Sequence, residues 1–581
     1  MRSQPLTFLC SLLCLGLLAQ PVSGASAVFA QGAVATDNEL ASQVGAAVLE
    51  RGGHAVDAAI ASALVLGVVN PFASGLGGGG FALVHDAATN TSIALDFRET
   101  APASIAREDY YPDGEHQRMA SRVGGLAVAT PGELAGMVAL HERFGRLPWH
   151  ELVQPALIIA QEGFPAHNLM VTRVAMLRER DPNFEEVLEA MYVIEGDLQV
   201  GTLVRRPKLA AALWRIARAP IQSFYHGEIA DDLANAVQAA GGKMSKSDLE
   251  GYQAIWREPL RTRFQGYDIE SFPLPSSGGI ILKMALHGFE ALQIASGEDP
   301  HQSPFDSAET LHRFLHALTW GFAVRAESLG DPAFVEMEIE RFLSDETTQR
   351  IVDSFAPSHR LPVEAFSLSP QLPNDAGTTH LSVIDGAGNA VAFTSTVNTI
   401  YGSRVVSPNF GILLNNEMDD FATAPLTPNA FGLVGLEANA VRPGARPLSS
   451  MSPTLVYQDG AVVGSLGGSG GPRIITGTLQ TLLRLMRGAN AEDAVQGERI
   501  HHQWIPEIVE LDTSLAERLG SELEAKDYTL APIRWQAAVQ AIWRHPAGWD
   551  AASDPSKEGA PAGAAHGTRE NRVRMENRPH P

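Results

Sequence analysis

A predicted β-hairpin deep in this 581-residue chain constrains its fold more than any other segment. Residues 379–385 and 390–396 alternate in the manner of two strands. The four residues between them are Gly-Ala-Gly-Asn, a composition typical of a tight turn. Thr378 and Thr379 stand at the start of the first strand. The sequence therefore predicts a hairpin that begins at two hydroxyl side chains.

The chemistry of Thr378 depends on whether the chain is cut in front of it. A threonine hydroxyl is a poor nucleophile unless a base takes its proton, and an N-terminal threonine carries that base in its own α-amino group. Cleavage between Gly377 and Thr378 would make the protein a self-processed amidohydrolase. Without cleavage the same residues only start a hairpin, and this segment alone leaves both alternatives open.

Composition excludes one broad class of function. The chain is 45% hydrophobic and 19% charged, so it has enough apolar residues for a sizeable core. Its formal net charge of −23 argues against a nucleic-acid binder, which needs a basic face. This charge does not by itself indicate a cationic substrate, because acidic proteins are commonly acidic for solubility.

The first 30 residues predict a secretory signal peptide. Arg2 precedes the apolar run 6–19, and small residues follow, with cleavage expected after Ala27 or after Ala30. The apolar run is too short to span a membrane, so we expect an exported protein, in the bacterial periplasm. The only cysteines, Cys10 and Cys14, lie inside this run. The mature chain is therefore expected to have no disulfide, no thiol nucleophile and no Cys-ligated metal. Separately, we expect neither a cofactor nor any other metal site.

Composition and periodicity divide the rest of the chain into expected helices, strands and linkers. Residues 133–260 are mostly helical in pattern, and residues 353–377, rich in Pro, Ser and Asp, predict an exposed linker. From about residue 556 the Gly, Ala, Pro and Arg content predicts a disordered tail. Other expected elements are helices at 39–50, 54–69 and 472–486 and strands at 81–85, 93–97, 411–414 and 454–465.

Two glycine motifs need separate interpretation. Residues 75–80 match G-x-G-x-x-G, but a helix precedes them and a strand follows, the reverse of a dinucleotide site, so we expect a closely packed glycine turn. Residues 467–471 match G-x-S-x-G between a strand and a helix, as in a serine-hydrolase elbow around Ser469. The same surplus of glycine also suits an oxyanion hole, and the pattern alone does not separate the two.

Histidines downstream bear on the serine-hydrolase alternative. His501, His502 and His545 follow Ser469 in the order that a triad would need. The adjacent pair His501-His502 also raises a metal site, but neighbouring imidazoles point in different directions and no H-E-x-x-H motif is present. We expect the pair to have a structural role.

Three weak signals together predict a site for a zwitterion. The 417–420 segment holds three acids that form either a solvated turn or a site for an ammonium group. Arg98 ends a strand and could bind a substrate carboxylate or simply pair with an acid of the protein. Ser449 and Ser450 are either turn residues or carboxylate ligands.

Taken together, the motifs resemble the γ-glutamyltransferase (glutathione hydrolase) family over residues 32–555. The resemblance implies an α+β fold, a four-layer αββα sandwich of the N-terminal-nucleophile hydrolase type. It also implies a precursor that cuts itself before Thr378 into a large subunit, 31–377, and a small catalytic subunit, 378–581. The matching stretches are 40–45, 53–59, 75–81, 96–99, 275–279, 378–380, 415–421 and 446–454.

The same resemblance implies a role for each matching residue. Thr378 would be the nucleophile, Thr396 and Asn398 would orient it and the glutamyl group, and Gly470 and Gly471 would form the oxyanion hole, which makes Ser469 a loop residue. The α-amino group of the substrate would be held by Asn398, Glu417 and Asp420, and its α-carboxylate by Arg98, Ser449 and Ser450. The implied partners are glutathione, other γ-glutamyl compounds and acceptor amino acids or peptides.

The chain departs from the family pattern at two positions. The lid segment, residues 428–432, has Phe431 where relatives with this lid commonly have Tyr, and Ala376-Gly377 replaces the polar residue often found before the cut. Two other functions stay in view: a glutaryl-type β-lactam acylase on the same fold, and a binding protein without catalysis. Related acylases tend to lack an acid matching Asp420, so Asp420 favours γ-glutamyl substrates.

Overall fold

The predicted hairpin forms two inner strands of a seven-stranded antiparallel sheet. The computed structural model describes residues 26–361, 377–533 and 536–564. The hairpin strands pair with each other and are flanked by β2 and β3, so the start of the hairpin lies inside the sheet. This first sheet runs in the order β20 (Ala562–Gly563), β2 (Ala33–Thr36), β11 (Gly377–Ile384), β12 (Ala390–Asn398), β3 (Gly79–Asp86), β4 (Thr91–Phe97), β8 (Ile255–Arg257).

A second seven-stranded antiparallel sheet packs face to face against the first. Phe81 of the first sheet meets Phe272, just after β10, with ring centroids 4.1 Å apart in the layer between the sheets. The second sheet runs in the order β1 (Ser26–Phe29), β19 (Gly548–Ser553), β18 (Ala538–His545), β14 (Ala461–Ser469), β13 (Thr454–Gln458), β10 (Tyr267–Ser271), β9 (Leu260–Phe264).

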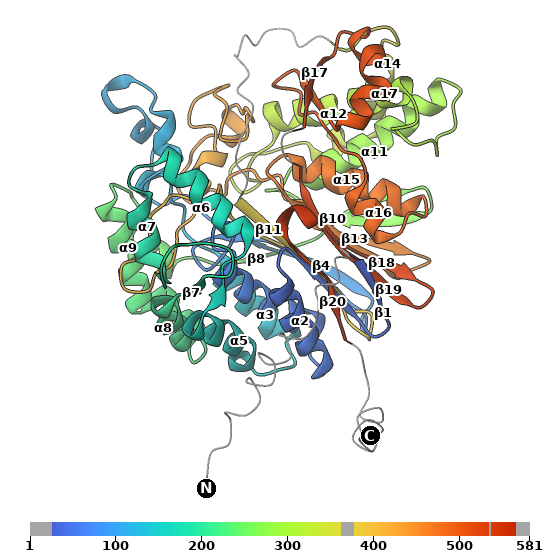
Figure 1. Cartoon of the computed structure of the whole chain (residues 1–581). Coiled ribbons are helices and arrows are strands. Elements are labelled where there is room, and N and C mark those ends of the chain that lie inside the picture. The colour runs from blue at the N-terminus through green and yellow to red at the C-terminus, as the bar shows by residue number, and fades with distance from the viewer. Residues whose placement is uncertain (1–25, 362–376, 534–535, 565–581) are drawn as a thin grey trace, which may run out of the picture.

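Helices cover the outer face of each sheet, so the fold is the expected four-layer αββα sandwich (Figure 1). Against or beyond the first sheet lie α2 (Glu39–Glu50), α3 (Ala55–Val69), α4 (Glu133–Phe144), α5 (Trp149–Glu162), α6 (Asn168–Arg180), α7 (Phe184–Met191), α8 (Pro207–Ile216), α9 (Glu228–Ala239) and α10 (Lys246–Glu250). Against or beyond the second lie α11 (Gly278–Ala295), α12 (Ala308–Ser328), α13 (Ile339–Phe342), α14 (Asp345–Asp353), α15 (Arg473–Met486), α16 (Ala491–Gln496) and α17 (Thr513–Glu524).

Two small sheets hold the remaining described strands. They consist of β15 (Ile500–His501), β16 (Ile508–Leu511) and β17 (Thr529–Pro532), and of β5 (Phe164–Pro165), β7 (Leu203–Arg205) and β6 (Val193–Ile194).

Helix α3 explains how an almost wholly apolar helix stays inside this fold. Its side chains are buried on nearly all sides because it lies between the first sheet and the outer helices. The His54 ring accepts from the Val56 N–H and Asp57 accepts from the His54 N–H, which caps its first turn. Among the described residues, no helix combines the length and apolarity needed to cross a bilayer.

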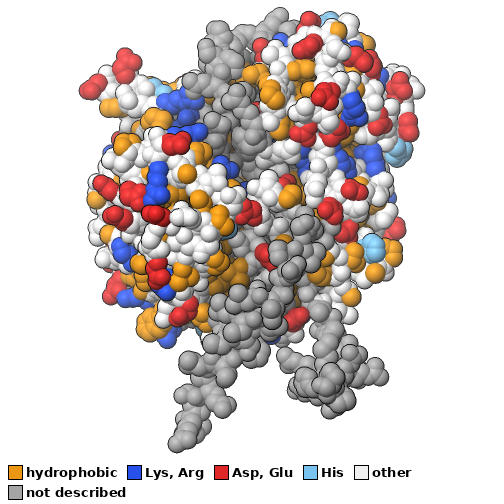
Figure 2. Space-filling model, viewed as in Figure 1, with side chains coloured by type: hydrophobic (Ala, Val, Ile, Leu, Met, Phe, Trp, Pro, Cys, Tyr) orange, Lys and Arg blue, Asp and Glu red, His pale blue; other side chains and the backbone are white. Residues whose placement is uncertain are grey.

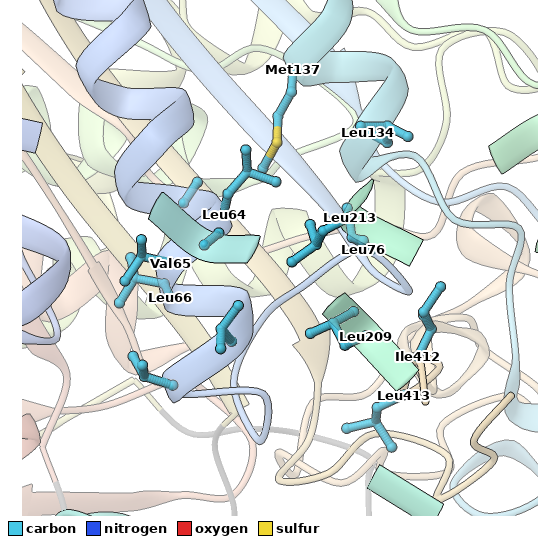
Figure 3. Close-up of a cluster of buried hydrophobic side chains, with 14 of the residues drawn as sticks. Leu64, Val65, Leu66, Leu76, Leu134, Met137, Leu209, Leu213, Ile412 and Leu413 are labelled. Atoms are coloured by element: carbon cyan, nitrogen blue, oxygen red, sulfur yellow. The ribbon is translucent and has the colours of Figure 1, made fainter. Parts of the chain in front are cut away.

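The expected strand at 411–414 was wrong. The segment is irregular and makes only an isolated bridge between Val406 and Leu413. Its apolar run has a different cause, because Ile412 and Leu413 pack with Leu76 and side chains of α3, α4 and α8 in a buried cluster (Figure 3). This cluster holds the segment against the glycine turn 75–80, where a Cβ atom on Gly77 would lie 1.9 Å from the Leu413 carbonyl oxygen.

The tail prediction was wrong as far as residue 564. Residues 555–557 form a short helical turn, and β20 pairs with β2 through Ala33 and Gly563. Much of the expected linker, residues 362–376, lies outside the described residues, as do most of the predicted signal peptide and residues 565–581. Segments before and after residue 377 contribute strands to both sheets.

Candidate active site

Thr378 lies near the start of β11, and strand geometry decides where its side chain faces. Successive side chains point to opposite faces of a strand, so Thr378 shares a face with His380. The His380 ring packs on Gly467 of β14, where a Cβ atom would lie only 2.4 Å from it. Burial lowers the pKa of His380 to about 3, so this ring is neutral. Thr378 therefore faces the end of β14 and the glycine loop that follows.

The hydroxyl of Thr396 contacts both the Thr378 hydroxyl and the carbonyl group of Gly377. Thr396 lies opposite Thr378 in the β11–β12 register, and their Oγ1 atoms are 3.0 Å apart. Thr396 Oγ1 also donates to the carbonyl oxygen of Gly377 at 2.9 Å and accepts from the Asn398 N–H at 2.8 Å. The Thr378 hydroxyl is thereby held beside the peptide bond that precedes it.

The glycine loop after β14 presents free backbone donors toward Thr378. Gly470 and Gly471 have φ angles of +133° and +56°, which favour glycine. At Gly471 a Cβ atom would also lie 2.6 Å from the Phe431 ring. Within the described chain neither N–H of this pair donates a hydrogen bond to the protein, and helix α15 begins just beyond, at Arg473. The loop thus has the donors and the helix N-terminus that stabilise an oxyanion.

Arg98 lies between two acids of the 417–420 turn. Its guanidinium bonds Glu417 and, at 2.6 Å, Asp420, and its Nε donates to the Pro447 carbonyl at 3.1 Å. Burial alone would lower the pKa of Arg98, but the carboxylates raise it, so Arg98 is charged. Burial raises the pKa of Glu417, and Glu417 Oε2 has no hydrogen-bond partner among the described residues. Arg98 therefore engages only one oxygen of Glu417, and Glu417 Oε2 is left available to a ligand within the described part of the chain.

Ser449 and Ser450 line the same cavity as Arg98, on a loop that is hydrogen-bonded to residues 275–277. The Ser449 N–H donates to the Pro275 carbonyl at 2.9 Å, and Ser277 bonds the Ser449 carbonyl. Ser449 Oγ accepts from the Met451 N–H at 3.1 Å. Ser450 Oγ is buried and has no hydrogen-bond partner within the described part of the chain. Its hydroxyl is available to a ligand.

One narrow cavity, with room of about 20 Å³, brings the predicted site together. Gly470 does not line it, although the adjoining Gly471 does. The chain also has a cavity of about 880 Å³ between β9, β10 and α11, which contains none of these residues. The lining of the narrow cavity is Arg98, Thr378, Thr396, Asn398, Glu417, Asp420, Phe431, Leu433, Ser449, Ser450, Met451, Gly471 and Ile474.

The structure does not bring together the residues of the alternative serine-hydrolase triad. Ser469 is the last residue of β14 rather than a loop residue, and its hydroxyl donates to the Ala538 carbonyl. His501 bonds Thr476 and Gln503. His502 bonds Thr319 and the Ile508 carbonyl, and His545 is exposed. None of the three histidines contacts Ser469.

The lid segment is tied to the site by contacts that do not need a tyrosine. Phe431 is buried against Gly471, and its carbonyl accepts from Gln503 Nε2 at 3.1 Å. Gln503 Oε1 in turn bonds His501 Nε2 at 2.8 Å. Asn429 Nδ2 donates to Asp420 Oδ1 at 3.0 Å. The lid is thus connected both to His501 and to an acid of the cavity.

Four polar residues near the site were missed by sequence reasoning. Ser395 donates to Glu133 at 2.7 Å, and burial raises the pKa of Glu133 to about 8. Lys557 bonds the Thr378 carbonyl and pairs with Asp37 at 3.0 Å. Asp37 stands just before the expected helix at 39–50, and Lys557 stands in the predicted tail, so neither carries a pattern that could reveal its role. Their proximity arises only from folding.

The two packed antiparallel sheets, with a threonine at the start of an inner strand facing a glycine loop, define an N-terminal-nucleophile hydrolase. The sequence profile of the Gamma-glutamyltranspeptidase family matches residues 41–564. The chain belongs to this family.

Individual relatives agree with this membership. The chain is 38% identical over 533 residues to the glutathione hydrolase proenzyme of Escherichia coli (strain K12), covering 90% of each. It is 37% identical over 566 residues to glutathione hydrolase 2 of Arabidopsis thaliana, covering 93% of this chain and 94% of that one. The cephalosporin acylase of Bacillus halodurans superposes with a TM-score of 0.79 at 25% identity, covering 95% of this chain and 99% of that one.

Proposed function

We propose that this chain is a γ-glutamyltransferase with glutathione hydrolase activity, activated by its own cleavage before Thr378. The observation that carries the proposal is the Thr396 hydroxyl, which contacts both the Thr378 hydroxyl and the Gly377 carbonyl. Family membership and the cavity lining support the same function.

Self-cleavage would use the geometry of the uncut strand. Thr378 Oγ1 attacks the carbonyl carbon of Gly377, the peptide nitrogen leaves, and an ester joins Gly377 to the Thr378 side chain. The nitrogen takes the proton of the attacking hydroxyl and becomes the free Thr378 amine. Water then hydrolyses the ester, which leaves a carboxylate on Gly377 and restores the Thr378 hydroxyl. Gly377 suits this position, because a Cβ atom there would lie 2.4 Å from the Thr399 carbonyl oxygen. Since both sheets contain strands from either side of the cut, the two subunits would remain associated.

Turnover reuses the same hydroxyl. The free α-amine, with an ordinary pKa of about 8, is partly neutral at neutral pH and takes the Thr378 proton as Oγ1 attacks the γ-amide. The Gly470 and Gly471 N–H groups stabilise the tetrahedral oxyanion, and one such donor is typically worth about 2.7–4 kcal/mol. The amine product leaves, and water or an acceptor amine releases the γ-glutamyl ester.

The cavity selects the glutamyl end of the substrate by charge. Glu417 and Asp420, with the side-chain carbonyl of Asn398, bind the substrate ammonium, which adds a second positive charge to that of Arg98 beside these acids. Arg98 and the Ser449 and Ser450 hydroxyls bind the α-carboxylate. The unpartnered Glu417 Oε2 and Ser450 Oγ support this assignment, because buried polar atoms normally have a partner.

The proposed donors are glutathione and other γ-glutamyl compounds, and the acceptors are amino acids or peptides. The predicted signal peptide supports export to a bacterial periplasm. On the face seen in Figure 2 the basic side chains form small separate groups rather than a continuous stripe, which fits a small-molecule substrate better than a nucleic acid.

An acylase is the second candidate, because the superposition on the cephalosporin acylase covers nearly the whole chain. A glutaryl group has no ammonium, so it would leave Asp420 without its ligand. Hydrolysis of γ-glutamyl and glutaryl anilides by the same preparation separates the two. A preference for the glutaryl anilide would overturn the γ-glutamyl assignment.

The proposed cleavage is tested by N-terminal sequencing and intact-mass analysis. The mature protein should yield a fragment that begins at Thr378, and Thr378→Ala should remain one inactive chain. A Thr378→Ala protein that still splits before residue 378 would contradict the proposal.

A further inference from the structure

A lysine from the far end of the chain contacts the backbone of the nucleophile. Lys557 Nζ donates to the carbonyl oxygen of Thr378 and pairs with Asp37 Oδ2 at 3.0 Å. The side chain of Lys557 is 11% exposed and that of Asp37 is fully buried. Asp37 Oδ1 accepts from Gln540 at 2.5 Å. The ammonium is therefore held in one place by two acceptors, one of which belongs to Thr378.

The topology of the first sheet creates the space for this contact. Strand β2 ends at Thr36, opposite Leu381, so Thr378 extends beyond the end of β2. Asp37 follows β2 directly. The chain after β19 returns to the same edge, where β20 pairs with β2 and Asp554 accepts from the Ser556 N–H at 2.9 Å. The position of Lys557 is thus fixed by the Asp554–Ser556 hydrogen bond before it and by strand β20 after it.

We infer that Lys557 is a positioning residue that lowers the basicity of the Thr378 α-amine, with Asp37 limiting the effect. This inference rests on the function proposed above. The amine and the carbonyl oxygen belong to one residue, so covalent geometry keeps the Lys557 ammonium within about 6 Å of the amine. A neighbouring cation disfavours a second positive charge, and the amine is therefore more often neutral and able to act as the base.

Several charged groups surround the Thr378 α-amine, but among those in the described residues only Lys557 hydrogen-bonds the Thr378 backbone. The cavity charges bind substrate, and Arg173 and Asp554 act on Lys557 from farther away. The charged and titratable groups facing Thr378 or its lysine are Asp37 beyond β2, Arg173 on α6, His380 on β11, Asp554 and Lys557 after β19, and Arg98, Glu417 and Asp420 in the cavity.

The inference predicts opposite pH shifts for two variants. Lys557→Met removes the cation and leaves Asp37, so the acidic limb of kcat/KM should move up by about one to two pH units. Asp37→Asn leaves the cation unopposed, so the limb should move down. Lys557→Arg keeps the charge and should stay within about half a unit of the parent enzyme.

The experiment measures the pH profile of γ-glutamyl anilide hydrolysis on purified, cleaved heterodimer. Lys526→Met is the matched control, because Lys526 also donates to a backbone carbonyl, that of Pro357, at 2.8 Å, away from the site. Coincident profiles for parent, Lys557→Met and Asp37→Asn would overturn the inference. If Lys557→Met does not accumulate, the direction of the Asp37→Asn shift decides. An inactive or uncut parent enzyme would instead contradict the proposed function.

Discussion

Thr378 and Thr396 lie directly opposite each other on adjacent strands, with their hydroxyl oxygens 3.0 Å apart. This pairing comes from the register of the β11–β12 hairpin, which places them on the same face of the sheet. Because Thr396 also donates to the Gly377 carbonyl, one hydroxyl contacts both groups that the proposed self-cleavage would use. This arrangement is present in the uncut strand, as the proposed self-cleavage requires.

Removing the Thr396 hydroxyl should slow self-cleavage. Thr396→Val keeps the β-branched shape but loses all three hydrogen bonds of Thr396 Oγ1, so the uncut precursor should persist when the parent is already split. The cleavage rate should fall about 10-fold or more. Gel electrophoresis of samples taken over time measures this rate. Thr396→Ser, which keeps the hydroxyl, should process nearly normally. Equal processing of the Val variant and the parent would refute the alignment role.

Neutralising Asp420 should change which acyl group the enzyme prefers. Asp420→Asn removes a charge that pairs with the substrate ammonium, so kcat/KM for a γ-glutamyl anilide should fall about 10- to 100-fold. Glutaryl anilide, which has no ammonium, should lose much less. The ratio of the two kcat/KM values is the measurement, with the exposed Glu437→Gln as control. An unchanged ratio would remove Asp420 from ammonium recognition.

Cutting the tie between Gln503 and the lid should loosen the lid without touching the nucleophile. Gln503→Leu loses the hydrogen bonds to the Phe431 carbonyl, the Ile505 carbonyl and His501, each worth about 0.5–1.5 kcal/mol net. Only the first of these bonds reaches the lid segment. KM should rise about two- to ten-fold, and limited proteolysis within residues 428–432 should accelerate. The control is Gln496→Leu, at an exposed glutamine that bonds only Glu492 among the described residues. A Gln503 variant with parental KM and proteolysis would show that lid packing alone suffices.

Glu133 should make stability fall as pH rises. Burial raises its pKa from 4.5 to about 8, so the folded state holds a proton that the unfolded state releases. Its contribution is complete below pH 4.5 and is lost as pH rises toward 8, at up to about 1.4 kcal/mol per pH unit. Glu133→Gln keeps an acceptor for Ser395 and should flatten this dependence, measured as unfolding free energy at pH 5 and pH 8. Parallel curves for both proteins would contradict it.

The local elements near the site were largely predictable because their signals are local. The hairpin, helix α3 and the strand–loop–helix around Gly470 follow from periodicity and glycine placement. The prediction of a strand at 411–414 was wrong for a physical reason. The segment is irregular, but it is buried in a cluster of side chains from other elements, so it is as apolar as a strand. The prediction of disorder around residue 557 was wrong for the opposite reason. The composition predicts a disordered tail, but pairing of β20 with β2 orders this segment.

Local sequence patterns were enough to predict that a threonine stands at the start of a strand and that charged groups suited to a zwitterion stand at separate places along the chain. Only the tertiary structure brought Arg98 between Glu417 and Asp420, faced Thr378 toward Gly471, and placed Lys557 against the Thr378 carbonyl. Local patterns report which face of a strand or helix is buried. Contacts between residues hundreds of positions apart depend on how the sheets pair and pack, which no local pattern encodes.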